Sequence, residues 1–217
     1  MPSHVSKILS QLYDKMFAHF GPQGWWPAET PFEVILGAIL TQNTNWGNVE
    51  KAITNLKKSG VLNPQALAKI PEAKLALLIR PAGYFNVKAK RVKNFLHFLA
   101  SEYEGSVEKL CAEEKGVLRE KLLGVKGIGP ETADSILLYA AKKPVFVIDQ
   151  YTYRVLTRHF LIEEEADYEG MQDFMMRHLK EEVSHFNEYH AQFVMVGKHF
   201  CRKSPRCDEC PLKGVNW

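Results

Sequence analysis

The feature that most constrains the fold of this chain is a glycine-rich turn that leads into a helix. An apolar run and then an acidic residue follow it. The turn is Gly127-Ile128-Gly129, Pro130 suits the first turn of a helix, and an apolar run then ends at Asp149. Glycines let backbone N–H groups approach a phosphate, and the helix N-terminus behind them adds a favourable dipole. The sequence therefore predicts phosphate contacts at Gly127, Ile128 and Gly129, although glycine turns also join helices that bind nothing.

The composition is that of an ordinary globular protein with a slight excess of positive charge. The 217 residues are 46% hydrophobic and 24% charged, and the net charge is +3. This balance permits nucleic acid binding without requiring it. Basic residues gather at 88–93 and 198–213, although a charge run is usually a solvated face. No apolar stretch approaches the roughly 20 residues that span a bilayer, so we expect a cytoplasmic protein with no membrane partner.

The apolar pattern is helical throughout, and no sustained two-residue alternation indicates a sheet. The fold class predicted from this pattern is all-α. The run 145–148 could form a short strand, but its length cannot decide between strand and helix. The predicted helices cover 8–17, 32–40, 49–56, 73–79, 87–99, 117–123, 132–141, 150–159, 168–183 and 186–199.

Asp149 has two compatible interpretations. An aspartate before Gln-Tyr-Thr-Tyr-Arg is typical of a helix N-cap. A carboxylate at the edge of an apolar segment could also stabilise the cationic sugar that forms as a glycosidic bond breaks, or deprotonate the attacking water. A capped carboxylate is held rigidly, so one side chain can fill both roles.

Two aromatic segments are the next signal. Trp25, Trp26 and Pro27 are consecutive, and Trp46 follows the polar run Gln-Asn-Thr-Asn, where a core residue is less expected. Large aromatics usually pack in a core. They also stack on bases extruded from DNA, and an indole face attracts a positively charged, alkylated purine.

Together these motifs resemble the helix-hairpin-helix (HhH-GPD) DNA glycosylases of the endonuclease III superfamily, over roughly residues 28–212. The resemblance implies two helical lobes with DNA in a cleft between them. One lobe would be a six-helix barrel at 25–134 that includes the hairpin. The second would combine 1–24 with 135–217. Asp149 would be the catalytic aspartate of the superfamily.

Within this superfamily the tryptophans resemble those of the 3-methyladenine glycosylase branch. Trp25 and Trp46 would then sandwich the flipped base, while Trp26 and Pro27 shape the pocket. Gln42 matches the position whose side chain fills the gap left by the extruded base. Its amide can both donate and accept hydrogen bonds, which suits an orphaned partner base.

Glu131 stands where strand-cutting members of the superfamily carry a lysine nucleophile. A carboxylate cannot form the Schiff base that this lysine forms. Lys126 lies before the tip of the hairpin and is poorly placed as a substitute. Although an acid in a first helical turn is also favourable to the helix dipole, the missing amine predicts an enzyme without strand-cutting activity.

Cys201, Cys207 and Cys210 are similar to the iron–sulfur loop of the superfamily, but the set is incomplete. The first gap is one residue short, and Asn216 stands where the fourth cysteine belongs. Four thiolates are usual for a 4Fe-4S cluster. Three alternatives stay open: a cluster with a non-cysteine or open fourth position, a zinc site that recruits His199, or no metal.

The leading prediction is a monofunctional DNA glycosylase that excises alkylated purines, chiefly 3-methyladenine. Its partner would be double-stranded DNA containing damaged bases, so it would associate with the nucleoid, and it would act as a monomer. One alternative keeps the fold and changes the substrate to oxidised pyrimidines or mismatched bases. Another is a non-catalytic DNA-binding module that uses only the hairpin.

Overall fold

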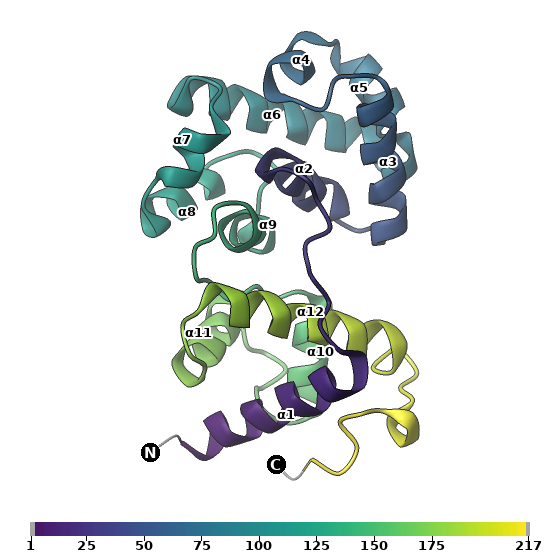
Figure 1. Cartoon of the computed structure of the whole chain (residues 1–217), viewed down its shortest axis with the longest axis vertical. Helices are drawn as coiled ribbons and strands as arrows, with labels where there is room; N and C mark the ends of the chain where they lie inside the picture. Colours follow the sequence, from purple (N-terminus) through teal and green to yellow (C-terminus); the bar gives the residue numbers. More distant parts are fainter. Residues whose placement is uncertain (1–2, 216–217) are drawn as a thin grey trace. The chain divides into compact units, whose positions relative to one another are not determined.

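The computed structural model describes residues 3–215, and these residues form helices and no β-strand (Figure 1). This confirms the all-α prediction. The chain divides into two compact units. The central unit is Trp26–Lys143, and the terminal unit joins the chain up to Trp25 with the chain from Pro144 onward. The predicted assignment of 25–134 to a six-helix barrel stays a prediction.

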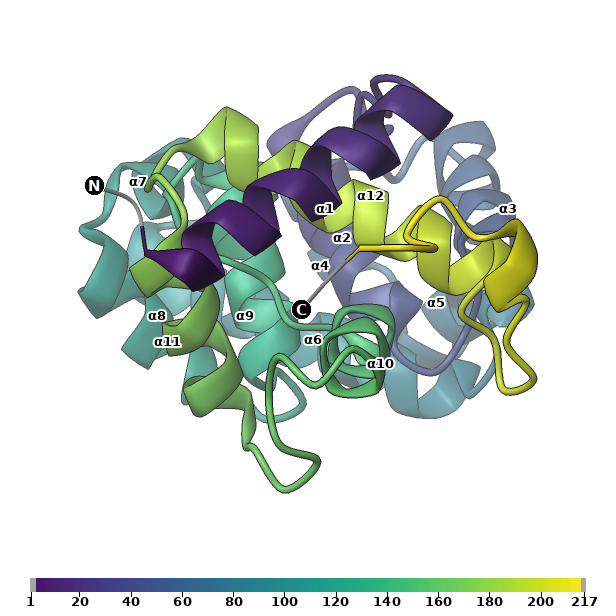
Figure 2. The ribbon, with the colours of Figure 1, turned by 90° about the horizontal axis from the view of Figure 1, so that it is seen from below.

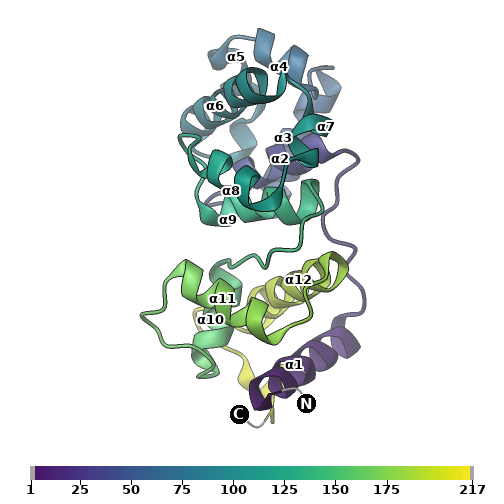
Figure 3. The same ribbon diagram turned by 90° about the vertical axis from the view of Figure 1, so that its left-hand side faces the viewer.

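The central unit is built around α2 (Pro31–Thr41), whose residues from Phe32 to Leu40 are all buried. It contacts α3, α6, α9 and η2, while α8 and α9 lie side by side (Figure 3). The other helices of this unit are α3 (Trp46–Lys58), α4 (Pro64–Lys69), α5 (Glu72–Leu78), η1 (Arg80–Ala82), α6 (Phe85–Tyr103), α7 (Val107–Ala112), α8 (Lys115–Leu123), α9 (Pro130–Ser135) and the π-helical turn η2 (Ile136–Ala140).

The terminal unit packs helices from both ends of the chain. Its elements are α1 (His4–Phe20), α10 (Gln150–Arg158), α11 (Tyr168–His178), α12 (Val183–His199) and η3 (Cys207–Glu209). Helix α12 contacts both α1 and α10, and Figure 2 shows α1 crossing it at an angle. The core is aromatic. The ring of Phe146 meets Phe186, Tyr189 and Phe193 at centroid distances of 5.4, 5.9 and 6.5 Å.

The structure corrects the predicted helices in two places. Helices α4 and α7 have only six residues each, too few for a visible apolar period, and their starts are fixed by Asn63 and Ser106, whose side chains accept from backbone N–H groups. The predicted helix 168–183 is too long. Helix α11 ends at His178 because Leu179 takes an extended backbone conformation, and α12 begins at Val183.

The run 145–148 is buried and forms neither helix nor strand. Among residues 3–215, no helix combines the length and the apolar character needed to cross a bilayer.

Candidate active site and nucleic-acid contacts

The turn between α8 and α9 is closed by its own backbone. The N–H of Ile128 donates to the carbonyl of Val125 at 3.0 Å, and the Ile128 side chain is buried. Gly127 has a φ of 102°, which favours glycine. Gly129 begins α9 with extended backbone, and a Cβ there would meet no atom within 4 Å. The three predicted phosphate-binding residues thus share one turn, in which Gly129 faces open space and Ile128 packs inward.

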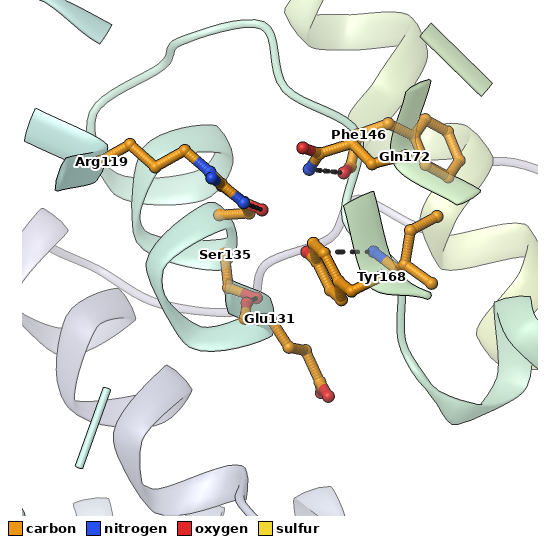
Figure 4. A network of polar contacts seen from close by, with 8 residues as sticks. Arg119, Glu131, Ser135, Phe146, Tyr168 and Gln172 are labelled. Atoms are coloured by element: carbon orange, nitrogen blue, oxygen red, sulfur yellow. Dashed lines mark hydrogen bonds and ion pairs between the residues drawn. The ribbon is translucent and has the colours of Figure 1, made fainter. Parts of the chain in front are cut away.

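A buried ion pair holds the two helices of this hairpin together (Figure 4). Asp134 of α9 is fully buried, and Arg119 of α8 donates to both carboxylate oxygens, from Nε at 2.8 Å and from Nη2 at 3.1 Å. Two-point pairing fixes geometry as well as charge. In the same helix, the hydroxyl of Ser135 donates to the carbonyl of Glu131 at 2.7 Å. The hairpin is therefore a rigid platform.

Gln42 is the first residue after α2, and its side chain lies against the hairpin. Its Nε2 donates to the carbonyl of Gly127 at 3.1 Å and to the hydroxyl of Thr132 at 2.9 Å. Its Oε1 accepts a hydrogen bond from Nη1 of Arg91, on α6. The structure therefore brings the predicted wedge residue and the predicted phosphate-binding turn together within the central unit.

Lys88 lies one turn before Arg91 on α6 and is almost fully buried. Its Nζ donates to the carbonyls of Leu40 at 2.9 Å and Ala82 at 2.7 Å. Burial, with a smaller contribution from Arg91, lowers the pKa of Lys88 to about 8, so the ammonium form still dominates at pH 7. The last carbonyls of a helix lack partners within it. Lys88 therefore ties the end of α2 to α6, immediately before Gln42.

Trp26, Trp46 and Tyr139 form an aromatic cluster in the central unit. The rings of Trp26 and Trp46 meet edge to face, with centroids 5.2 Å apart and planes at 90°. Tyr139 is buried in η2, and its ring centroid lies 5.1 Å from that of Trp26. A Cβ at Gly37 would lie 3.0 Å from Nε1 of Trp26, so α2 carries a glycine where the indole packs. Both tryptophans are half-buried and can still offer ring surface to a flat ligand.

The other two predicted pocket residues are Trp25 and Pro27. Pro27 is exposed, and Trp25 is half-buried in the terminal unit. The stacking of a base on Trp25 and Trp46 stays a prediction. Glu131 is exposed in the first turn of α9, and Lys126 is exposed in the turn before it.

Asp149 is the N-cap of α10, which confirms that interpretation. Its Oδ1 accepts a hydrogen bond from the backbone N–H of Thr152 at 2.7 Å. Its side chain keeps 13% of its surface exposed, so the carboxylate is fixed but still accessible. Its catalytic role stays a prediction.

His190 of α12 faces the other oxygen of this carboxylate, with Nε2 3.7 Å from Oδ2 of Asp149. Burial lowers the pKa of His190, and the negative charge of Asp149 opposes that shift without overcoming it. The ring is therefore neutral at pH 7. Asp149 accordingly lies next to an uncharged neighbour.

Two side chains of α11 hold the segment that leads to Asp149 (Figure 4). Gln172 donates from Nε2 to the carbonyl of Phe146 at 2.7 Å, and the hydroxyl of Tyr168 accepts from the N–H of Ile148 at 3.4 Å. A buried backbone needs such partners. One face of α11 thus supplies hydrogen bonds that a neighbouring strand would otherwise provide.

The three C-terminal cysteines line one cavity of about 290 Å³ in the terminal unit. Cys201 is buried, Cys210 half-buried and Cys207 exposed. Within residues 3–215, no three His, Cys, Asp or Glu side chains lie close enough to bind one metal ion. Asn216, at the place of the fourth cysteine, lies outside the described residues. As placed, this donor set fits neither a four-thiolate cluster nor a zinc site that uses His199.

Arginines hold this cysteine loop through its backbone. Arg154 donates to the carbonyls of Cys201 at 2.5 Å and Gly197 at 3.2 Å. Arg158, one turn later on α10, donates to the carbonyl of Arg202 at 2.6 Å and to the sulfur of Cys201 at 3.4 Å. Burial also raises the pKa of the Cys210 thiol. The loop is therefore held by guanidinium groups of α10.

The sequence did not single out Arg91, Thr132, His190 or Gln172 for these sites. Arg91 belongs to a basic run that also suits a solvated face. One signal was available: it follows Lys88 by three residues, so both cations share one face of α6. The other three residues sit in helices whose partners are distant in sequence, and no local pattern marks them.

Comparisons with known proteins show which family this chain resembles. Residues 36–181 match the family described as HhH-GPD superfamily base excision DNA repair protein. A Methanocaldococcus jannaschii protein named "Putative DNA repair glycosylase" is 44% identical over 215 residues, which are 98% of this chain and 97% of that protein.

Two solved structures are similar to the structure of this chain. The 3-methyladenine DNA glycosylase (MagIII) of H. pylori, bound to 1,N6-ethenoadenine, has a TM-score of 0.78 and 32% identity over 89% of this chain and 97% of its own. An endonuclease III–DNA complex has a TM-score of 0.83 and 20% identity, over 99% and 95% of the two chains, and shares the fold.

Proposed function

Because this chain belongs to the HhH-GPD superfamily of base excision DNA repair proteins, we propose that it is a monofunctional DNA glycosylase of alkylated purines. It hydrolyses the N-glycosidic bond of 3-methyladenine in double-stranded DNA and leaves an abasic site. Glycosylase activity as such follows from the family and its relatives. The choice of base and the absence of strand cleavage depend on particular residues of this chain.

In this proposal the aromatic cluster determines which damaged base is bound. Its half-buried indoles, Trp26 and Trp46, offer electron-rich surface, which attracts the positive charge of an alkylated adenine. In this proposal Trp25 and Trp46 sandwich the base, and Trp26 and Pro27 shape the pocket. The 32% identity with the 3-methyladenine glycosylase of H. pylori supports the same choice.

Asp149 supplies the chemistry. When the bond between base and C1′ breaks, its electron pair leaves with the base, which becomes neutral and needs little acid catalysis. The sugar then carries the positive charge at C1′, and the capped carboxylate stabilises it. A water oxygen bonds to C1′, and the water proton passes to Asp149 and then to solvent. The neutral ring of His190 places no positive charge beside this carboxylate.

The hairpin and Gln42 prepare the duplex. Gly127, Ile128 and Gly129 anchor a phosphate through the turn, independently of sequence. Gln42 fills the gap that the extruded base leaves and meets the orphaned partner base through its amide.

Glu131 accounts for the expected absence of strand cleavage. It is exposed in the first turn of α9, where its carboxylate suits the helix dipole but cannot form a Schiff base with the sugar. Lys126 is the nearest exposed amine of the turn, and it precedes Gly127. Borohydride trapping of a covalent enzyme–DNA adduct would show whether any amine takes the missing role.

Base release from methylated duplex DNA tests this proposal. The freed bases are identified by chromatography, and strand integrity is scored before and after alkali. We expect release of 3-methyladenine, strands that stay intact until alkali is added, and no trapped adduct.

Other outcomes select among the alternatives. Release of oxidised pyrimidines or mismatched bases instead of 3-methyladenine would reject the alkylated-purine pocket and keep the glycosylase. Tight DNA binding with no release of any base would favour a non-catalytic binding module. Strand breaks together with a trapped adduct would reject the interpretation of Glu131.

A further inference from the structure

We propose that Arg91 is a positioning residue for Gln42. This inference rests on the proposed function, in which Gln42 enters the gap in the duplex. Arg91 donates from Nη1 to Oε1 of Gln42, while Gly127 and Thr132 accept from Nε2 at 3.1 and 2.9 Å. All four residues belong to the central unit. Arg91 therefore acts on the opening of the duplex, and Asp149 acts on the bond that breaks.

The partners of Gln42 allow only one orientation of its amide. Arg91 has donors and no acceptor, so it can meet only the oxygen of the amide. The carbonyl of Gly127 is an acceptor and can meet only the nitrogen. Because Arg91 only donates and the carbonyl of Gly127 only accepts, a flipped amide would lose both contacts. Arg91 thus decides which edge of the amide points toward the hairpin.

Arg91 is itself held in place by the same turn. A Cβ at Gly127 would overlap the side chain of Arg91, so the arginine lies directly across the glycine. Its neighbour on α6, Lys88, donates to the carbonyl of Leu40 at 2.9 Å, two residues before Gln42. One face of α6 therefore fixes the backbone just ahead of Gln42 and also its side chain.

This arrangement orders a flexible side chain before DNA arrives. A glutamine loses conformational freedom when it is fixed, and a site that is already ordered does not incur that cost during binding. We expect Arg91 to increase the fraction of duplex that is opened at the lesion, with no effect on the bond-breaking step itself.

A double-mutant cycle of Arg91→Ala and Gln42→Ala tests this inference. The readout is the fluorescence of 2-aminopurine opposite an abasic-site analogue, which rises when the base unstacks. Arg91→Ala should reduce opening by about tenfold when Gln42 is present. It should cause no further reduction in the Gln42→Ala protein, because the residue that it positions is then gone.

Two control variants separate positioning from charge. Lys90→Ala removes the same charge from the next residue of α6, an exposed one, and should leave opening nearly unchanged. Arg91→Lys keeps the charge but loses the planar fork, and should resemble Arg91→Ala. Melting temperatures of all variants are measured alongside. If Arg91→Ala does not fold, Arg91→Lys takes its place in the cycle.

The outcomes are distinct. Equal losses caused by Arg91→Ala with and without Gln42 would overturn the inference, because Arg91 would then act on DNA directly. An unchanged signal in Gln42→Ala alone would also overturn it, since no wedge would exist to be positioned. The assay needs no particular damaged base, so failure to release 3-methyladenine would reject the proposed substrate and leave this test valid.

Discussion

Asp149 and Gln42 carry the proposed reaction, and the molecule holds them in different ways. Asp149, in the terminal unit, accepts from the backbone of the helix that it caps and faces the buried ring of His190. Gln42, in the central unit, is held by the side chains of Arg91 and Thr132 and by one carbonyl of a turn. The hydrogen bond to Asp149 comes from the backbone of a helix, whereas two of the three hydrogen bonds of Gln42 involve side chains.

The difference matches what each residue has to do. A carboxylate that stabilises a developing cation works best when it cannot move, because reorganisation during the reaction would raise the barrier. A side chain that enters a duplex must keep its orientation while it gains a base as a new partner. The side-chain contacts of Gln42 can adjust to the base without unfolding a helix, whereas loss of the Asp149 cap would open the first turn of α10.

The largest expected effect is that of Asp149→Asn. Asparagine caps a helix about as well as aspartate, so α10 and the melting temperature should be preserved. The negative charge is lost, and single-turnover excision should fall by about a thousandfold or more, while DNA affinity is retained. Asp149→Ser is the matched control, because serine also caps and also lacks the charge. Equal loss of affinity and excision would refute the catalytic role of Asp149. The contrast between a fixed catalytic residue and an adjustable Gln42 would then no longer hold.

The next effect is expected at the hairpin, from Gly127→Ala. Its φ of 102° is strained for alanine, and the new Cβ would displace Arg91 from Gln42. Unfolding free energy should drop by about 2 kcal/mol, and opening of the duplex should fall as in Arg91→Ala. Gly129→Ala is the control, since Gly129 has extended backbone and open space. If both variants were equally stable in denaturant unfolding, Arg91 would not be held by Gly127.

Most helices could be predicted from the sequence because their apolar residues recur at helical spacing. Long amphipathic helices such as α1, α6 and α12 repeat their buried residues over several turns. Helices α4 and α7 have six residues each, too few to show a period. The break between α11 and α12 depends on the backbone conformation of residue 179 and has no local apolar signal.

The candidate sites were predicted unevenly, for a physical reason. Glycines at a turn and an aspartate before a helix are local signals, so Gly127 and the cap at Asp149 could be recognised from a few neighbouring letters. Their partners come from distant helices: His190 reaches Asp149 across 41 positions (190 − 149), and Arg91 meets Gln42 across 49. Such contacts follow from packing. The cysteine spacing was a local signal too, but its donor set is incomplete.

Acid should weaken the terminal unit through one buried and two half-buried histidines. Burial lowers the pKa of His190 in the folded protein, and His159 and His185 shift in the same direction for the same reason. Below the usual value of about 6.5, the unfolded chain therefore binds more protons than the folded one. Above that pH the histidines cost no stability. As pH falls toward the lowered pKa, the unfolding free energy decreases by up to about 1.4 kcal/mol per pH unit for His190, and by less for His159 and His185, which solvent screens.

His190→Gln should remove the share of this acid sensitivity that belongs to the Asp149 site. The measurement is urea unfolding across a pH series, compared with the unchanged chain. The slope below about pH 6.5 should become shallower in the variant. An identical slope would mean that the ring near Asp149 is not held neutral by burial, and the carboxylate would then face a charged partner.

The smallest expected effect concerns the support behind Asp149. Gln172→Met removes the donor to the carbonyl of Phe146, a bond of 2.7 Å in a buried place, and should cost about 1 kcal/mol in unfolding free energy. Tyr168→Phe removes a longer bond of 3.4 Å and should cost less. If this segment only stabilises the terminal unit, kcat should be unchanged in both variants. If it also aims the carboxylate, kcat should fall more in Gln172→Met than in Tyr168→Phe while KM stays constant, since a rigid site tolerates small displacements poorly.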